Sequence, residues 1–398
     1  MIKKNLWIVL IVSLCGFQFG YNTSIISGAI LFVSKTFSLS FINQGHAVSI
    51  LIIGALVGTL LGGFLANRLG RKGGMQGACL FFMGGALVAS LSNTLGWFLV
   101  GRVLQGIGVG SVAVIAPMYL VEIIPPNKRG VYLGISQIFL VGGGLIAYIC
   151  TVLLAKTGDW RLMLGLGVVP AILQFVLLFF IPESKETSTK PKEMSWKLLL
   201  SPSFRGVLSE GVFLNIFQQL VGINAVCYFL PRILEKAGYG ERALVTTLGI
   251  GVINVIVTII AAKLIDSVGR RPLLLWGTVG IVITLCLAAL SLNGEGPWTQ
   301  MIALFSLTAY IACFTMSMGP LPSLITAEIY PAIIKDQAMS LATFFNWAAN
   351  YVVTLTFLSL AQTITFPGAF LLYAIMGVLA FVFIWKRVPE TKGMKEVT

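Results

Sequence analysis

The sequence NRLGRK at residues 67–72 follows one long apolar run, and DSVGRR at residues 266–271 follows another. Two further pairs of segments repeat in the same order: PMYLVE at 117–122 with PSLITAE at 322–328, and PES at 182–184 with PET at 389–391. The copies are separated by 199, 206 and 207 residues. These near-constant offsets predict two similar halves, with the charged loops at matching points of each half.

The composition places the chain in a membrane. Of its 398 residues, 57% are hydrophobic and 10% are charged, and its mean hydropathy is +0.94. A soluble domain carries about 25% charged residues. The values therefore exclude a soluble enzyme, a disordered chain and a soluble repeat scaffold. They indicate a protein that crosses the membrane many times, with spans of about 20 apolar residues.

Twelve apolar runs are long enough to be spans. They cover residues 6–34, 45–67, 75–95, 97–121, 130–155, 160–181, 204–236, 243–266, 271–292, 298–327, 334–361 and 366–386. The runs are too long for the strands of a membrane barrel, and they lack polar alternation. The first run continues past the length of a signal peptide and is interpreted as a retained span. The sequence predicts an all-α membrane protein of twelve helices.

Basic residues set the predicted orientation, because loops on the cytoplasmic side carry an excess of Lys and Arg. With both termini in the cytoplasm, 20 of the 27 basic residues fall on the inner side and 6 on the outer side, and Arg102 lies within a span. The predicted organisation is an N-terminal half at 1–181, a short cytoplasmic linker at 182–203 and a C-terminal half at 204–398. Two parallel halves around a midplane site are typical of alternating-access transporters.

Other chemistries find little support in the sequence. The six cysteines lie in apolar stretches without a CxxC pair, which argues against a disulfide framework or a zinc site. His46 is the single histidine, so we expect no metal site. No catalytic set or phosphate-binding loop can be assembled, so we expect neither an enzyme nor a cofactor. The net charge of +13 comes from short clusters between spans, which does not favour nucleic acid as a partner.

Several strings resemble the sugar porter family of the major facilitator superfamily, and the match covers nearly the whole chain. They are GFQFGYNT at 16–23, GR at 101–102, PMYLVE at 117–122, RG at 129–130, QQLVGINA at 218–225, GRRP at 269–272, EIYP at 328–331, NW at 346–347 and PETKG at 389–393. The strings at 218–225 and 389–393 together point to the sugar branch. The chain is similar to facilitative glucose and fructose carriers and to bacterial proton symporters for xylose and glucose.

Amide side chains are the natural neutral ligands for sugar hydroxyls, because both groups donate and accept hydrogen bonds. Gln218, Gln219 and Asn224 share the seventh span, but Gln219 and Asn224 would lie about 140° apart on a regular helix. A regular helix would not direct both amides at one ligand. Gly222 lies between them and can interrupt the helix, as in the broken helices of other transporters. We expect these three residues to contact the sugar.

The resemblance implies further sugar-site residues. These are Phe19, Gln137, Tyr228, Asn254, Phe314, Gly319, Ser323, Asn346 and Trp347. Interhelical hydrogen bonding is the alternative for the amides, and ordinary packing is the alternative for the aromatic residues. For Asn350, two roles are equally consistent with the sequence: contact with the sugar, or a hydrogen bond between helices. Ser323 stands where family members usually carry Trp, so we expect a wider site or a different preferred sugar.

Charges at the inner helix ends predict a gate. The candidates are Arg68, Arg71, Glu122, Arg129, Arg270, Arg271 and Glu328, whose opposite charges could bridge the halves in the inside-closed state. Simple positive-inside topology is the alternative for the arginines. Proton symporters of the family carry Asp at the position of Asn22, near the arginine that matches Arg102. An amide at this coupling position favours transport without protons.

The sequence thus predicts a monomeric carrier of hexose-type monosaccharides in the cell membrane, surrounded by lipids and working by facilitated diffusion. A proton-coupled sugar symporter is the nearest alternative, because it would share the fold. A drug exporter of the same superfamily is a second alternative, but its cavity would be aromatic and poor in amides. A nutrient sensor would usually add a long cytoplasmic tail, and only about a dozen residues follow the last span.

Overall fold

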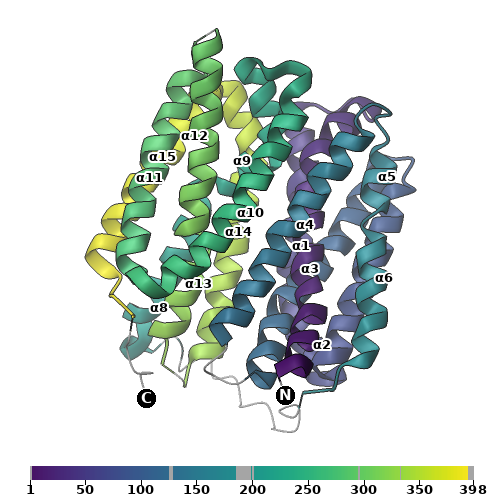
Figure 1. Ribbon diagram of the computed structural model, residues 1–398, viewed down its shortest axis with the longest axis vertical. Coiled ribbons are helices and arrows are strands. Elements are labelled where there is room, and N and C mark those ends of the chain that lie inside the picture. The colour runs from purple at the N-terminus through teal and green to yellow at the C-terminus, as the bar shows by residue number, and fades with distance from the viewer. Residues whose placement is uncertain are drawn as a thin grey trace. The chain divides into compact units, whose positions relative to one another are not determined.

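The computed structural model describes residues 2–124, 129–184, 199, 201–294, 296–331 and 333–392. Within these ranges, the side chains of residues 2–5, 67, 121, 129–133, 266, 267 and 336 are not described. Every regular element in the described part of the chain is a helix (Figure 1). Most of the predicted linker and the side chain of Arg129 lie outside the described residues.

The chain divides into two compact units, and each is described by itself. Unit 1 comprises Met1–Pro191 together with Thr247–Val255, and unit 2 comprises Lys192–Thr246 together with Ile256–Thr398. The predicted halves follow the same division along most of the chain. The segment Thr247–Val255, in the middle of the predicted eighth span, clusters with unit 1.

Six helices form most of unit 1. They are α1 (Ile2–Thr36), α2 (Phe41–Ser90), α3 (Leu95–Ile123), α4 (Arg129–Leu154), α5 (Trp160–Gly165) and α6 (Val168–Leu177). Helix α2 holds two predicted spans, because Gly70 interrupts it with φ 78° and ψ 173°. Helices α5 and α6, with the 3-10 turn Leu178–Phe180, together form the predicted sixth span.

Unit 2 is built from the remaining helices, apart from the part of α10 that clusters with unit 1. They are α8 (Pro202–Leu220), α9 (Ile223–Leu234), α10 (Ala243–Val268), α11 (Arg270–Ser291), α12 (Pro297–Met316), α13 (Leu321–Ile329), α14 (Lys335–Thr363) and α15 (Thr365–Arg387). A π turn at Glu235–Tyr239 and a 3-10 turn at Gly240–Arg242 connect α9 to α10. Helix α11 packs against α12 and α15, and α8 packs against α14.

The helices account for the twelve predicted spans. Eleven segments of the described chain are long and apolar enough to cross a membrane. One of them, Pro202–Ile265, has 64 residues, whereas one crossing needs about 20. Because this segment includes the interruptions at Gly222 and Gly238, it crosses twice. The chain is therefore an all-helical membrane protein of twelve spans, as the sequence predicts.

Glycines allow α2 and α3 to pack closely in unit 1. A Cβ atom on Gly54 would lie 2.2 Å from the carbonyl oxygen of Val103, and one on Gly106 would lie 1.9 Å from the carbonyl oxygen of Leu51. Real Cβ atoms do not approach so closely, so these positions need glycine. Small residues that let helix backbones touch are typical of membrane helix interfaces. This contact packs the second predicted span against the fourth.

Two of the predicted spans are broken in unit 2. The run 204–236 divides into α8 and α9 at Gly222, which the sequence analysis anticipates. The run 298–327 was expected to be one helix, and this expectation is wrong: α12 ends at Met316 and α13 begins at Leu321. The sequence GPLP at 319–322 explains the break, because Pro320 and Pro322 provide no amide hydrogen for a continuous helix.

Candidate functional site

The helix break at Gly222 creates the centre of the candidate site in unit 2. Gly222 has φ 88° and ψ 11°, in the left-handed region where residues with a Cβ are strained. Its amide donates to the carbonyl of Gln219 at 2.9 Å, which ends α8, and its carbonyl accepts from Val226 at 3.0 Å, which begins α9. The change of direction places Gln219 and Asn224 together, despite their separation on a regular helix.

Four amide side chains form one hydrogen-bonded cluster around this break. Asn224 Nδ2 donates to Gln219 Oε1 at 2.6 Å, and Gln219 Nε2 donates to Asn346 Oδ1 at 3.1 Å. Asn346 Nδ2 in turn donates to Gln218 Oε1 at 2.5 Å. The cluster joins α8, α9 and α14, three elements far apart in sequence. We call Gln218, Gln219, Asn224 and Asn346 the amide cluster.

The second broken helix supplies backbone acceptors to the amide cluster. Gln218 Nε2 donates to the carbonyl oxygens of Met318 at 2.7 Å and Gly319 at 2.8 Å. Both carbonyls belong to the connection between α12 and α13, where they lie outside regular helix. Unwound backbone at membrane depth is tolerated where protein groups or a cavity satisfy it. Gly319 thus contributes its backbone carbonyl, a role that the residue type does not indicate.

The other predicted residues of unit 2 differ in exposure. Trp347 and Tyr228 are buried, with 6% and 5% of their surface exposed. Phe314 is half-buried, whereas Ser323 is exposed. Trp347 follows Asn346 directly on α14, so it lies beside the amide cluster. Their contact with a sugar remains a prediction.

Asn350 lies one turn after Asn346 on α14. It is 2% exposed, and its Oδ1 accepts from Thr354 Oγ1 at 3.0 Å within the same helix. This bond satisfies the amide oxygen locally. This bond lies within one helix, so contact with a sugar and a bond between helices both stay predictions for Asn350.

Unit 1 contains a buried cation. Arg102 on α3 is 1% exposed, and both its Nη atoms lie 3.3 Å from the backbone oxygen of Asn22 on α1. Arg102 Nη1 also donates to Gln105 Oε1 at 2.8 Å. The side chain of Asn22 donates to the carbonyl of Gln18 at 2.9 Å. The two predicted coupling residues are therefore in contact, through the Asn22 backbone.

Phe19, Gln137 and Asn254 are the remaining predicted sugar-site residues. All three fall in unit 1, on α1, α4 and the Thr247–Val255 part of α10. Gln137 is exposed, and the other two are half-buried. Their contact with a sugar remains a prediction.

A carboxylate cluster follows the first GR sequence in unit 1. Arg71 forms an ion pair with Glu122 at 2.9 Å, and the hydroxyl of Ser184 donates to the other oxygen of Glu122. Glu183 Oε1 accepts from the backbone amide of Lys72 at 3.1 Å. A Cβ atom on Gly70 would lie 2.7 Å from Cδ of Glu183, so the glycine makes room for this carboxylate.

The same cluster recurs in unit 2. Arg270 forms an ion pair with Glu328 at 3.4 Å, and the hydroxyl of Thr391 donates to Glu328. Glu390 accepts from the backbone amides of Arg270 and Arg271, both at 3.1 Å. Gly269 has φ 106°, in the same left-handed range as Gly70. The sequence repeat is thus also a repeat of local structure.

Backbone hydrogen bonds control the charge of Glu390. Burial alone would raise the pKa of this carboxyl, but bonds from the amides of Lys392, Arg270, Arg271 and Thr391 outweigh burial. The resulting pKa lies below the ordinary value of 4.5. Hydrogen bonds to the ionised form favour that form. Glu390 therefore fixes the start of α11 as a carboxylate near neutral pH.

The predicted gate residues pair within their own units. Glu122 contacts Arg71 in unit 1, and Glu328 contacts Arg270 in unit 2. Arg271 Nη2 donates to the carbonyl of Trp385 at 2.7 Å, also in unit 2. The bridging of the two halves by these charges stays a prediction.

Arg68 and Arg129 complete the predicted gate set. The guanidinium of Arg68 lies 4.7 Å from the centre of the Phe64 ring, one turn earlier on α2. This is cation–π geometry, in which the ring attracts the positive charge. The side chain of Arg129 lies outside the described residues. The gate role of both arginines stays a prediction.

Several polar residues escaped the sequence analysis. Asn215 contacts Thr326 Oγ1 at 3.0 Å, and its backbone oxygen accepts from Asn346 Nδ2 at 2.9 Å. Gln105 holds Arg102, and Tyr310 donates to the carbonyl of Val221 at 2.8 Å. Asn215 and Gln105 had a usable signal, because each is an amide three residues from a predicted site residue. Tyr310 had no such signal.

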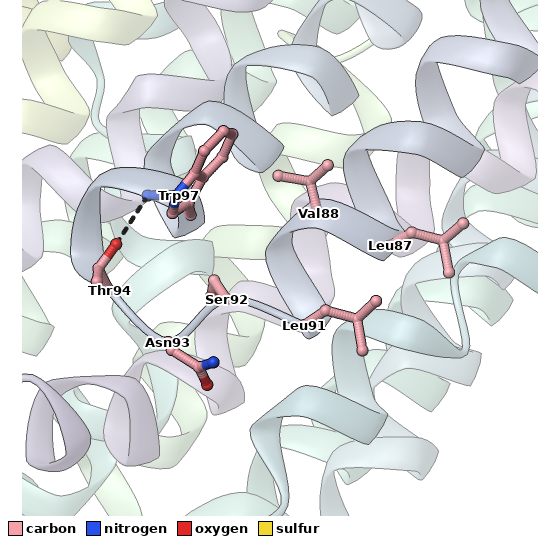
Figure 2. Close-up of a pocket in the computed structure, with 7 residues that line it drawn as sticks. All are labelled: Leu87, Val88, Leu91, Ser92, Asn93, Thr94 and Trp97. Atoms are coloured by element: carbon pink, nitrogen blue, oxygen red, sulfur yellow. Dashed lines mark hydrogen bonds between the residues drawn. The ribbon is translucent and has the colours of Figure 1, made fainter.

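Neither of two surface hollows coincides with the predicted residues. The larger, of about 550 Å³, lies at the turn between α2 and α3 and is lined by Leu87, Val88, Leu91, Ser92, Asn93, Thr94 and Trp97 (Figure 2). Thr94 caps α3 by accepting from the Trp97 amide at 3.4 Å. The other, of about 380 Å³, lies between α8 and α15. Among the described residues, no group of three or more His, Cys, Asp or Glu side chains could hold a metal.

Known proteins match this chain over nearly its whole length. A family profile described as "Sugar (and other) transporter" matches residues 8–187 and 184–396. The chain is 32% identical to the glucose transporter GlcP of Staphylococcus epidermidis, over 98% of this chain and 96% of that protein. It is 32% identical to the D-xylose-proton symporter of Escherichia coli, over 97% and 93%. A crystal structure of a D-xylose-proton symporter matches with a TM-score of 0.87 and 30% identity, over 98% of this chain and 100% of that one.

Proposed function

The chain belongs to the sugar (and other) transporter family, and we propose that it carries hexose-type monosaccharides by facilitated diffusion. Its twelve spans and its family make it an integral protein of the plasma membrane. The family and its structural relatives are transporters rather than enzymes.

The amide cluster is the observation that supports a sugar site. Its four side chains meet at one place on α8, α9 and α14, and each can exchange an internal hydrogen bond for one to a sugar hydroxyl. Buried polar groups must remain bonded, so the cluster is satisfied by itself when no sugar is present. A drug exporter would need apolar contacts at this place instead of amides.

The amide side chain of Asn22 supports transport without protons. A proton relay through a membrane normally uses an Asp, Glu or His side chain within the span. Arg102 contacts the backbone of Asn22 and the side-chain amide of Gln105. The amide side chain of Asn22 cannot bind and release a proton near neutral pH. Glu210, on α8, is the carboxylate through which a proton-coupled alternative would act.

Uptake into proteoliposomes with an imposed inward proton gradient tests the proposal. We expect radiolabelled sugar to equilibrate without accumulating above its external concentration. A panel of unlabelled hexoses, pentoses and polyols as competitors then identifies the preferred sugar. The matched variant is Asn22→Asp, which places a titratable carboxyl beside Arg102 and should make uptake depend on the proton gradient.

Two outcomes would contradict the proposal. Accumulation by the unaltered protein that a protonophore abolishes would identify a symporter, the activity named for the Escherichia coli relative. Competition by cationic drugs without competition by any sugar would identify an exporter instead. A Glu210→Gln variant distinguishes the source of coupling in the first case, because only coupling through that carboxylate would be lost.

A further inference from the structure

Tyr310 on α12 contacts the helix break at Gly222 from outside the amide cluster. Its hydroxyl donates to the carbonyl oxygen of Val221 at 2.8 Å. Both residues are fully buried, with 0% of their surface exposed. Val221 is the last residue before the left-handed Gly222, so this bond is made at the interruption itself.

In a continuous helix, a backbone amide would take the place of the Tyr310 hydroxyl at this carbonyl. In an uninterrupted helix, the Val221 carbonyl would accept the amide of Ala225, four residues further along. The left-handed turn at Gly222 removes that partner, and a buried carbonyl without a partner is costly. The hydroxyl of Tyr310 replaces the missing donor. It therefore stabilises the broken form of the span and offers nothing to the continuous form.

A second tyrosine contacts the same break in a different way. A Cβ atom on Gly222 would lie 2.3 Å from Cδ2 of the Tyr373 ring, so the ring packs directly against the glycine. The hydroxyl of Tyr373 has no hydrogen-bond partner, although the residue is only 3% exposed. Tyr310 thus acts through its hydroxyl, whereas Tyr373 acts through its ring. This difference provides a matched pair for an experiment.

We infer that Tyr310 is a positioning residue that holds the break between α8 and α9 and thereby keeps Gln219 and Asn224 together for the sugar. The inference rests on the proposed sugar site for its functional consequence. The structural part stands without it, because the competition between Tyr310 and the Ala225 amide for one carbonyl does not involve a ligand. Loss of the hydroxyl favours the continuous helix, in which the two amides separate.

Hydrogen exchange measured by mass spectrometry on the detergent-purified protein without sugar tests the structural part. In Tyr310→Phe, we expect slower exchange in a peptide that spans residues 221–229, because the Ala225 amide gains the Val221 carbonyl. In Tyr373→Phe, we expect the exchange of the unaltered protein, because that hydroxyl has no partner. Equal exchange in both variants and the unaltered protein would overturn the inference.

Sugar binding tests the functional part. We expect Tyr310→Phe to raise the Kd for the transported sugar at least about fivefold, in line with the loss of one buried hydrogen bond, and Tyr373→Phe to leave it within about twofold. Equal Kd values for the two variants would overturn the positioning role. If the unaltered protein binds no sugar, the proposed function fails, but the exchange experiment still decides on the break.

A rescue variant separates positioning from general stability. Ala225→Pro removes the competing amide and places the proline ring against the Val221 carbonyl, so the continuous helix is excluded. In the Tyr310→Phe background, we expect Ala225→Pro to restore the Kd to within about twofold of the unaltered protein. It should also restore folding if Tyr310→Phe alone folds poorly. A double variant that remains as weak as Tyr310→Phe would overturn the inference.

Discussion

The two units share their charged loops but differ in their interiors. Each unit carries a left-handed glycine, an Arg–Glu ion pair, a hydroxyl bond to the same glutamate and a second carboxylate on backbone amides. In unit 2, two helices are broken and four amides meet between them. In unit 1, α1 and α3 are continuous, and the buried polar group that stands out is Arg102.

This difference distinguishes features that stabilise both units from features that occur in only one of them. The features that both units share lie at the ends of helices and stabilise them. We propose that the features found in only one unit serve sugar binding or coupling. Two of the buried glutamines illustrate the contrast: Gln218 belongs to the amide cluster of unit 2, whereas Gln174 contacts Gln18 and Cys15 in unit 1.

The largest expected effect is on Gln218. Gln218→Ala removes two bonds to backbone carbonyls and one to Asn346, so we expect sugar binding to weaken roughly 5- to 150-fold, as for a loss of about 1–3 kcal/mol. Gln174→Ala is the matched control from unit 1, and its sugar Kd should stay unchanged. Equilibrium binding of labelled sugar to both purified variants measures the difference.

Stability measurements on both variants are the control for this comparison. Both glutamines are buried, so both variants should unfold at a lower temperature, and only Gln218→Ala should also lose affinity. A well-folded Gln218→Ala protein with normal Kd would remove this residue from the site. Equal loss of affinity in both variants would show that the two interiors are less different than we propose.

An intermediate effect is expected for the two ion pairs. The side chains of Arg71 and Glu122 are 13% and 8% exposed, whereas those of Arg270 and Glu328 are 16% and 26% exposed. Because leaving a buried charge without its partner costs more than leaving an exposed one, Glu122→Gln should destabilise unit 1 by about 1–3 kcal/mol and Glu328→Gln should cost less. Chemical unfolding of the two single variants measures the order.

The double variant tests the predicted gate. Loss of a contact specific to one state shifts the population toward the other, so the double Gln variant should change the accessibility of cysteine probes near Gly70 in the middle of α2 and near the start of α11. The single variants serve as controls for purely local effects. Unchanged accessibility in the double variant would mean that the ion pairs only stabilise each unit.

The smallest expected effect concerns Glu390 and pH. Its pKa is lower in the folded protein than in the unfolded chain, so its stabilising contribution is present above the unfolded value and is lost as the pH falls through the folded value. Glu390→Gln should therefore lose part of the acid dependence of stability below about pH 4.5. Glu390→Asp, which keeps the charge, is the control. An identical pH profile of thermal unfolding in Glu390→Gln and the unaltered protein would refute the role of these amide bonds.

Hydrophobic runs predicted most of the fold. A run of about 20 apolar residues must form a helix in a bilayer, because only internal hydrogen bonds can satisfy its backbone. Twelve spans and their repeat could be predicted for this reason. The break at Gly222 could also be predicted, because this glycine lies between Gln219 and Asn224, which would face different directions on a regular helix. The break at residues 317–320 was missed, although two prolines close to it were visible.

The polar contacts were harder to predict. The sequence named Gln219, Asn224 and Asn346, but not that each bonds to the next, because Asn346 is 127 residues away from Gln219. It named Glu122 and Glu328 as gate residues with nearby arginines, but it did not say that Glu122 would contact Arg71 or that Glu328 would contact Arg270. A charge pattern predicts the net charge of a loop, but it does not predict which residue each charged side chain contacts.

The sequence by itself determined a twelve-helix membrane transporter with repeated halves. The length of each apolar run, the positions of the basic residues and the spacing of the repeated motifs can each be read directly along the chain. Only the tertiary structure decided that Tyr310 holds the break at Val221 and that the carbonyls of Met318 and Gly319 complete the amide cluster. The physical reason is that a buried polar group takes whichever partner packing brings within about 3 Å. Residues far apart in sequence provide those partners, and sequence spacing does not encode the distance between them.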